Sequence, residues 1–165
     1  MAIAFARVSI HSRSKGHSAV AAASYRSGTE LIDVRTGITH DFSNRKDVAW
    51  SAILLPKDAD SAFDNREFLW NQVEAAEKRI DAQVCKDLVL ALPKELDKTH
   101  QIELTKRFAQ AHFVEKGLPA DITIHDNGDG NPHAHILIPT RRLEKNRFSK
   151  HKARDLNPAF ANGRF

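Results

Sequence analysis

The alternation of apolar and polar residues along the chain predicts several short β-strands. Residues 3–10, IAFARVSI, have the two-residue period of a strand, because successive side chains on a strand point to opposite faces. Residues 121–139, DITIHDNGDGNPHAHILIP, contain two such runs joined by Asn, Asp, Gly and Pro, a composition that favours a hairpin loop. Further strands are predicted at residues 48–56 and 84–93, and a further hairpin at residues 30–42, turning at Thr36-Gly37.

Three segments are predicted to form helices, and the second of them has the period of an amphipathic helix. Glu74 and Glu77 fall on the polar side of the second one, where we expect a solvated face. Mostly antiparallel strands with helices packed on the sheet define the α+β class, which is the predicted fold. The helices span residues 18–28, with Ser18 as N-cap and Gly28 as the stop, residues 63–80, and residues 97–116, with Asp97 as N-cap.

Length and composition predict one folded domain. The chain has 165 residues, and its hydrophobic content of 41% excludes wholesale disorder. The single cysteine, Cys85, has no partner for an intramolecular disulfide, which indicates a reducing compartment. No apolar run reaches membrane-spanning length, and the first ten residues are too short and too alternating for a signal peptide, so we expect no membrane insertion.

Positive charge gathers at the two ends of the chain. Residues 1–26 contain four Lys or Arg and no acid, and residues 141–165 contain eight Lys or Arg against two acids. This distribution favours contact with a polyanion such as DNA, although a basic C-terminal segment can also be a solvated or disordered tail. The arginines that we expect to contact DNA are Arg7, Arg26, Arg141 and Arg142.

Three histidines in the predicted hairpin at residues 121–139 predict a metal site. His133 and His135 share one face of their strand, and pairing with the preceding strand can bring His125 beside them. Three neutral nitrogen ligands suit a catalytic divalent ion with an open coordination position. The alternative is a set of strand histidines that make ordinary hydrogen bonds.

Asp87 is the carboxylate that we single out. It lies in a predicted buried strand, where an unpaired charge is costly, and a metal-binding histidine commonly donates its second N–H to a carboxylate. We therefore expect Asp87 to support the metal ligands, with a surface salt bridge as the alternative. Weaker candidates for the same role are Glu74, Glu77 and Asp126.

Three stretches together resemble the motifs of the MobA/MobL family of conjugative relaxases, closest to its TraA-like group, within the HUH endonucleases. They are SAVAAASYRSG, WNQVEAAEKRIDAQVCKDLVLALPKEL and HDNGDGNPHAH, and the resemblance covers about residues 2–143. It implies a sheet of about five antiparallel strands, with Tyr25, the only tyrosine, as nucleophile. It also implies that Asp87 is the acidic residue of the site and that the three histidines hold Mg²⁺ or Mn²⁺, although other transition metals bind imidazole well. Ala134 is smaller than the usual middle residue of the His-hydrophobe-His motif, but it faces away from the site.

The resemblance also implies a function and partners. The protein would nick one DNA strand at the transfer origin of a plasmid or other mobile element, form a 5′-phosphotyrosyl intermediate, and rejoin the strand. Its partners would be single-stranded DNA with an adjacent hairpin, relaxosome accessory proteins and a type IV secretion coupling protein, in the bacterial cytoplasm. We expect residues 1–143 to form the nuclease domain, and residues 144–165 to form a flexible basic segment that leads into further domains of a longer protein.

Alternative functions remain at this point. An HUH replication initiator or transposase would use the same chemistry at another DNA site, although a single tyrosine disfavours initiators that use tyrosine pairs. A metal-stabilised DNA-binding module would use the histidines without catalysis. A zinc hydrolase is disfavoured because the histidines have no neighbouring general base such as the Glu of H-E-x-x-H.

Overall fold

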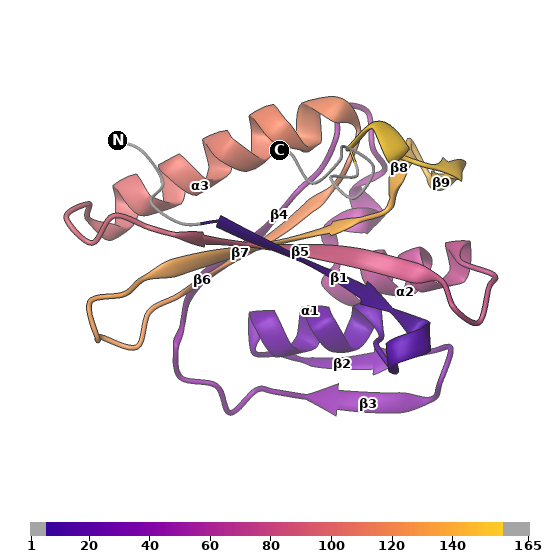
Figure 1. Ribbon diagram of the computed structural model, residues 1–165, viewed down its shortest axis with the longest axis horizontal. Helices are drawn as coiled ribbons and strands as arrows, with labels where there is room; N and C mark the ends of the chain where they lie inside the picture. The colour runs from indigo at the N-terminus through magenta and orange to yellow at the C-terminus, as the bar shows by residue number, and fades with distance from the viewer. Residues whose placement is uncertain (1–5, 157–165) are drawn as a thin grey trace.

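The computed structural model describes residues 6–156, and at its centre lies a five-stranded antiparallel sheet (Figure 1). The strand order is β1-β5-β7-β6-β4, which confirms the predicted α+β fold. Residues 3–5 of the first predicted strand lie outside the described residues. The strands span Ala6–Ser12 (β1), Val48–Leu54 (β4), Gln83–Ala91 (β5), Ala120–His125 (β6) and His133–Pro139 (β7).

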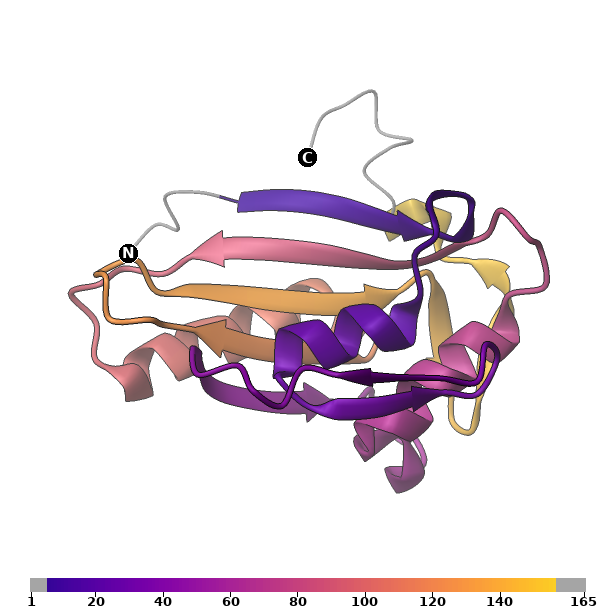
Figure 2. The same cartoon turned by 90° about the horizontal axis from the view of Figure 1, so that it is seen from below.

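Helices cover both faces of this sheet and make a three-layered molecule. Helices α1 (Ala19–Ser27) and α2 (Arg66–Ala76) pack on one face, and α3 (Lys98–His112) packs on the other (Figure 1). Seen from the α1 side, α1 lies over the sheet with a two-stranded ribbon beside it (Figure 2). That ribbon consists of β2 (Glu30–Asp33) and β3 (Ile38–Asp41) and confirms the hairpin predicted at residues 30–42. Alternation along β5 sends Cys85 into the core under α1, and Leu88 and Leu90 into the core under α3.

Helix α1 is short and closely packed because its sequence is rich in small residues. The hydroxyl of Ser18 accepts a hydrogen bond from the Ala21 amide, which confirms the predicted N-cap. Gly28 ends the helix in the left-handed conformation at φ 65°, where a side chain would be strained. A Cβ on Gly28 would also lie 3.1 Å from Cγ2 of Val48 and 3.3 Å from Cβ of Arg45. The C-terminal end of α1, which carries Tyr25, therefore lies directly against the chain that leads into β4.

The second helix differs from its prediction. A 3₁₀ turn, Ser61–Asp64, comes first, and α2 ends at Ala76, so that Ile80 is 92% exposed instead of continuing the apolar stripe. The prediction that Glu74 and Glu77 lie on a solvated face is wrong, because both are buried. Each is neutralised by a cation from a distant element: Arg13 lies 2.6 Å from Glu74, and Arg141 lies 2.7 Å from Glu77.

The basic segment that follows β7 is partly folded. Residues Arg141–Glu144 (β8) and Arg147–Lys152 (β9) form a hairpin, and a 3₁₀ turn follows at Arg154–Leu156. These residues of the expected basic segment therefore have regular secondary structure, and the expected boundary at 143/144 falls within β8. Residues 157–165 lie outside the described range. Between residues 6 and 156, no helix has both the length and the apolar character needed to span a membrane.

Candidate metal and tyrosine site

Three histidines converge at one end of the central strands. In the β6–β7 pairing, His125 lies directly opposite His133, and Thr123 lies opposite His135, so all three imidazoles occupy the face covered by α1. One nitrogen from each ring lies within 4.8 Å of the others, and the ring centroids are 4.7 to 5.4 Å apart. The hairpin that the sequence predicts therefore brings its histidines together, and this cluster can hold a metal ion.

The second nitrogen of each ring already has a partner. Nε2 of His125 lies 2.6 Å from the Arg26 carbonyl oxygen, and Nδ1 of His133 lies 3.1 Å from the Asn131 carbonyl oxygen. Nδ1 of His135 lies 3.2 Å from both carboxylate oxygens of Asp87. A neutral imidazole donates through one nitrogen and keeps a lone pair on the other. Nδ1 of His125 and Nε2 of His133 and His135 are thus the atoms available to an ion.

The protonation state of His125 fits this role. His125 is 2% exposed, and burial lowers the pKa of its imidazole to about 4. The ring is therefore neutral at pH 7, and its lone pair does not compete with a proton. Three imidazoles, each with a hydrogen-bond partner on the nitrogen that does not face the cluster, form a donor set that divalent transition metals prefer. The residues present therefore fit such an ion.

Asp87 lies beside the cluster and contacts His135. It is 2% exposed, and it accepts a hydrogen bond of 2.8 Å from Nη2 of Arg26 as well as its contact with His135. Burial alone would raise the pKa of this carboxyl, but the hydrogen bonds from His135 and Arg26 outweigh burial and hold the pKa at about 2. The ionised carboxylate can therefore orient the His135 ring.

We predict that Asp87→Asn lowers the affinity for Mn²⁺ by about 10- to 100-fold, because the ring of His135 loses the charge that orients it and raises its basicity. Titration calorimetry with Mn²⁺ measures this change. The comparison variant is Asp126→Asn, since Asp126 is exposed and its carboxylate accepts a hydrogen bond from the Gly128 amide. Equal loss in both variants, or no loss in Asp87→Asn, would contradict the assignment of Asp87 as the supporting carboxylate.

Tyr25 lies at the helix end that contacts the histidine cluster. It lies in the last turns of α1, and the following residue, Arg26, contacts His125 through its carbonyl and Asp87 through its guanidinium. The Tyr25 residue is 48% exposed. Its ring packs edge-on against Phe42, with centroids 5.1 Å apart, and the guanidinium carbon of Arg45 lies 4.5 Å from its centroid. The phenol is therefore accessible, while two side chains flank its ring.

No pattern in the sequence marked the residues that surround Tyr25 and Arg26. Phe42 is the last residue of the predicted hairpin at residues 30–42, Arg45 lies in the polar stretch that follows it, and no motif marks either residue. His11 of β1 was also missed: its Nε2 lies 3.4 Å from Arg26, and burial first, then the Arg26 charge, lowers the pKa of its ring to about 4. His11 lies on the same face of β1 as Ser9, which pairs with Asp87, but this pairing is seen only in the structure.

The arginines expected to contact DNA do not form one group. Arg7 is exposed on β1, and Arg26 is bound to Asp87. Arg141 pairs with Glu77, and Arg142 lies 2.7 Å from Asp155. Both belong to β8, which follows the end of β7 opposite to its histidines, and the position of β8 is shown in Figure 1. The alternative carboxylates are also apart from the ring nitrogens: Glu74 and Glu77 pair with the cations described above, and Asp126 is exposed.

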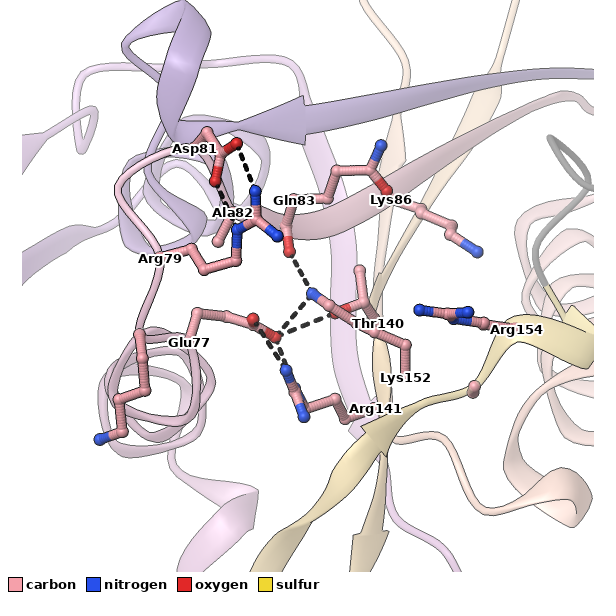
Figure 3. A pocket seen from close by; sticks show the side chains of 12 residues that line it. Glu77, Arg79, Asp81, Ala82, Gln83, Lys86, Thr140, Arg141, Lys152 and Arg154 are labelled. Atoms are coloured by element: carbon pink, nitrogen blue, oxygen red, sulfur yellow. Dashed lines mark hydrogen bonds and ion pairs between the residues drawn. The ribbon is translucent and has the colours of Figure 1, made fainter.

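A basic pocket of about 380 Å³ lies at that opposite end (Figure 3). Glu77 is its central anion and lies 2.7 Å from Arg141 and 2.8 Å from Lys152. Burial, followed by the positive charge of Lys152, lowers the pKa of Lys86 to about 8. Cations outnumber acids among the lining residues, so the pocket attracts anions. It contains none of the three histidines and is separate from the candidate metal site.

Comparisons with known proteins place the chain among mobilization proteins. A model of the MobA/MobL family matches residues 17–163. The conjugal transfer protein TraA of Agrobacterium fabrum is 37% identical over 162 residues, which cover 92% of this chain and 15% of that protein. The mobilization protein MobL of Acidithiobacillus ferridurans is 33% identical over 172 residues, which cover 89% of this chain and 45% of that protein.

A solved structure is also similar. A chain from a study described as "Molecular Basis of Vancomycin Resistance Transfer in Staphylococcus aureus" is 35% identical, and the two folds superpose with a TM-score of 0.87. The match covers 94% of this chain and 82% of that chain. The present chain thus has nearly the whole of its length in common with that fold, but it spans less than half the length of the curated TraA and MobL proteins described above.

Proposed function

The chain belongs to the MobA/MobL family, and from this premise we propose that it is a relaxase nuclease domain that nicks one DNA strand at a transfer origin. One observation carries the proposal: three imidazole nitrogens lie within 4.8 Å of one another, beside the helix end that bears the only tyrosine. A three-histidine cluster next to an accessible phenol suits metal-assisted attack on a phosphodiester. The names of the relatives, which refer to conjugal transfer and mobilization, support the same reaction.

In the proposed reaction, Tyr25 is the nucleophile. Its phenolic oxygen attacks the phosphorus of the scissile phosphodiester and releases its proton to solvent. A bond forms between that oxygen and phosphorus, the bond from phosphorus to the 3′ oxygen breaks, and the leaving oxygen takes a proton from water as a 3′-hydroxyl. The 5′ end of the cut strand stays on the protein as a phosphotyrosyl ester. Since one phosphodiester replaces another of similar energy, the released 3′-hydroxyl can attack this ester and rejoin the strand.

The residues around Tyr25 would prepare the site for that attack. His125, His133 and His135 would hold a divalent ion, Mg²⁺ or Mn²⁺, which when bound supplies positive charge to the oxygens of the scissile phosphate. Asp87 holds the His135 ring, and Arg26 holds Asp87. The carbonyl of Arg26 fixes the tautomer of His125, because it accepts the proton on Nε2. The end of α1 is therefore hydrogen-bonded directly to His125 and is connected to His135 through Asp87.

The substrate class follows from the open surface at this site. An unpaired strand can bend so that one phosphate reaches a half-exposed tyrosine, whereas a stiff duplex cannot, so we propose single-stranded DNA with an adjacent hairpin. Because the curated relatives are much longer than this chain, we also propose that this chain acts as the nuclease part of a larger protein. Accessory proteins at the origin and a type IV secretion coupling protein would then be its partners. The names of the relatives favour this function over a replication initiator or transposase.

The test is covalent capture. The protein is incubated with Mn²⁺ and single-stranded DNA from the candidate transfer origin of its own element, and a DNA-shifted band that resists SDS is sought. We expect this band with the origin sequence and its absence with a scrambled sequence or with EDTA. If several origin fragments give no band while calorimetry still detects Mn²⁺ binding, the nuclease proposal fails and a metal-stabilised binding module becomes the better interpretation.

A further inference from the structure

The segment between β3 and β4 crosses the end of α1 at the position of Tyr25. Gly28 permits this approach, because a side chain there would meet Arg45 and Val48. The amide of Arg45 donates a 3.1 Å hydrogen bond to the Phe42 carbonyl, which makes a tight turn beside the helix end. The turn brings the side chains of Phe42 and Arg45 to the ring of Tyr25.

Arg45 is held in a single arrangement by three contacts. Its Nε and Nη2 donate to the two carboxylate oxygens of Asp47 at 2.9 and 2.6 Å, the two-pronged geometry that fixes a guanidinium plane. Its Nη1 donates to the backbone carbonyl of Tyr25 at 2.9 Å. The hydrogen bonds from Arg45 lower the pKa of Asp47 to about 2, so this pair stays ionised at neutral pH. The guanidinium carbon is then 4.5 Å from the Tyr25 ring centroid, within the range of a cation–π contact.

The same segment is joined to the metal-ligand strand. The carbonyl of Asp47 accepts a 2.8 Å hydrogen bond from the Asp126 amide, and Val48 pairs with His125 across β4 and β6. Arg45 therefore links Tyr25 to the histidine strand by a route separate from Arg26. A half-exposed tyrosine on a helix end would otherwise have rotamer freedom, and a displacement of about 1 Å in a reacting group can cost about 100-fold in rate.

We propose that Arg45, anchored by Asp47, is a positioning residue that holds the Tyr25 side chain in the orientation required for attack. This inference rests on the proposed function of Tyr25 as nucleophile. Arg45 acts through its contacts with the ring and the backbone carbonyl of Tyr25. The ring of Phe42 packs edge-on against the Tyr25 ring and further limits its movement. A residue with this role affects cleavage and rejoining equally, because both reactions pass through the same transition state.

The experiment compares Arg45→Gln, Arg45→Lys and Asp47→Asn with the unaltered protein in single-turnover cleavage of origin DNA. We expect Arg45→Gln to cleave about 10- to 100-fold more slowly, and the other two to be intermediate, since lysine keeps the charge and Asp47→Asn keeps the guanidinium. Rejoining slows by the same factor, so the ratio of cleaved to joined DNA is unchanged. The matched control is Arg107→Gln, an exposed arginine of α3 on the other face of the sheet, which cleaves at the normal rate.

Three further measurements separate positioning from other roles. DNA affinity, measured with each Arg45 variant in a Tyr25→Phe background, should change less than about twofold, as should Mn²⁺ affinity. The melting temperature should be unchanged. A loss of DNA affinity that accounts for the slower cleavage would make Arg45 a DNA contact and overturn the proposal. Normal cleavage by Arg45→Gln would overturn it as well. Both outcomes leave the proposed function intact, because that function fails only if the unaltered protein forms no adduct.

Discussion

Replacing Tyr25 with phenylalanine should abolish the covalent protein–DNA adduct and lower metal-dependent strand cleavage by at least about 1,000-fold, as loss of a nucleophile does in other enzymes. Tyr25 is the only tyrosine in the chain, so no second phenol can replace it. Phenylalanine keeps the ring that packs against Phe42 and Arg45, and it removes only the attacking oxygen. The adduct is measured on denaturing gels with origin DNA labelled on the 5′ side or the 3′ side of the nick.

The labelling also tests the polarity of the proposed reaction. Only DNA labelled on the 3′ side of the nick, the fragment whose 5′ end would become attached, should shift with the protein. Affinity for the uncut DNA and for Mn²⁺ should be unchanged in Tyr25→Phe, which shows that the variant is folded. A residual adduct in this variant would identify a different nucleophile, and an adduct on the other fragment would mean that the leaving group is the 5′ oxygen.

The histidine cluster and Asp87 were predictable because they lie on strands. A two-residue period fixes which side chains share a face, and a hairpin loop fixes which strand is the partner. His125, His133 and His135 could thus be placed together before their distances were known. Asp87 could be placed on the face opposite Leu88 and Leu90 for the same reason, and its burial required a partner.

Buried ion pairs between distant elements were not predictable in the same way. A glutamate on the polar side of a helix has the same local pattern whether it faces water or an arginine from another element. Glu74 meets Arg13 from the turn after β1, and Glu77 meets Arg141 from β8. The basic residues after β7 were therefore interpreted as a flexible tail, although two of them, Arg141 and Lys152, pair with Glu77 at the end of α2. Arg45 and Asp47 were missed because loop residues have no period from which a partner can be inferred.

Arg26 is a basic residue whose buried ion pair changes the role expected from its charge. The sequence placed it among the arginines that contact DNA, yet its guanidinium is bound to Asp87 and its carbonyl to His125. Breaking a buried ion pair leaves an uncompensated charge, so its loss would disturb Asp87 and then His135. The role that its contacts support is to fix the tyrosine helix to the metal ligands. Together with Arg45, it gives α1 two separate connections to that cluster.

Removing one imidazole of the histidine cluster should strongly lower both the affinity for Mn²⁺ and the cleavage of DNA. We expect His133→Ala to lower Mn²⁺ affinity by more than about 100-fold, because even loss of a residue that only orients a ligand costs about 10- to 100-fold. His133 is the best choice among the three: its Nδ1 contacts only the Asn131 carbonyl in the described part of the chain, and it is less buried than His125. Its loss therefore leaves no buried charge unpaired, and folding should be preserved.

The consequence for cleavage distinguishes a metal ligand from a general structural residue. Adduct formation by His133→Ala should be undetectable at an Mn²⁺ concentration that saturates the unaltered protein, and should partly return as Mn²⁺ is raised, since two imidazoles still bind the ion weakly. His100→Ala is the matched control, because His100 is exposed at the start of α3 and contacts Asp97. Calorimetry measures the affinities and gel assays measure the adduct. Unchanged Mn²⁺ affinity in His133→Ala, or cleavage that no Mn²⁺ concentration restores, would mean that the histidines serve another purpose than holding the ion.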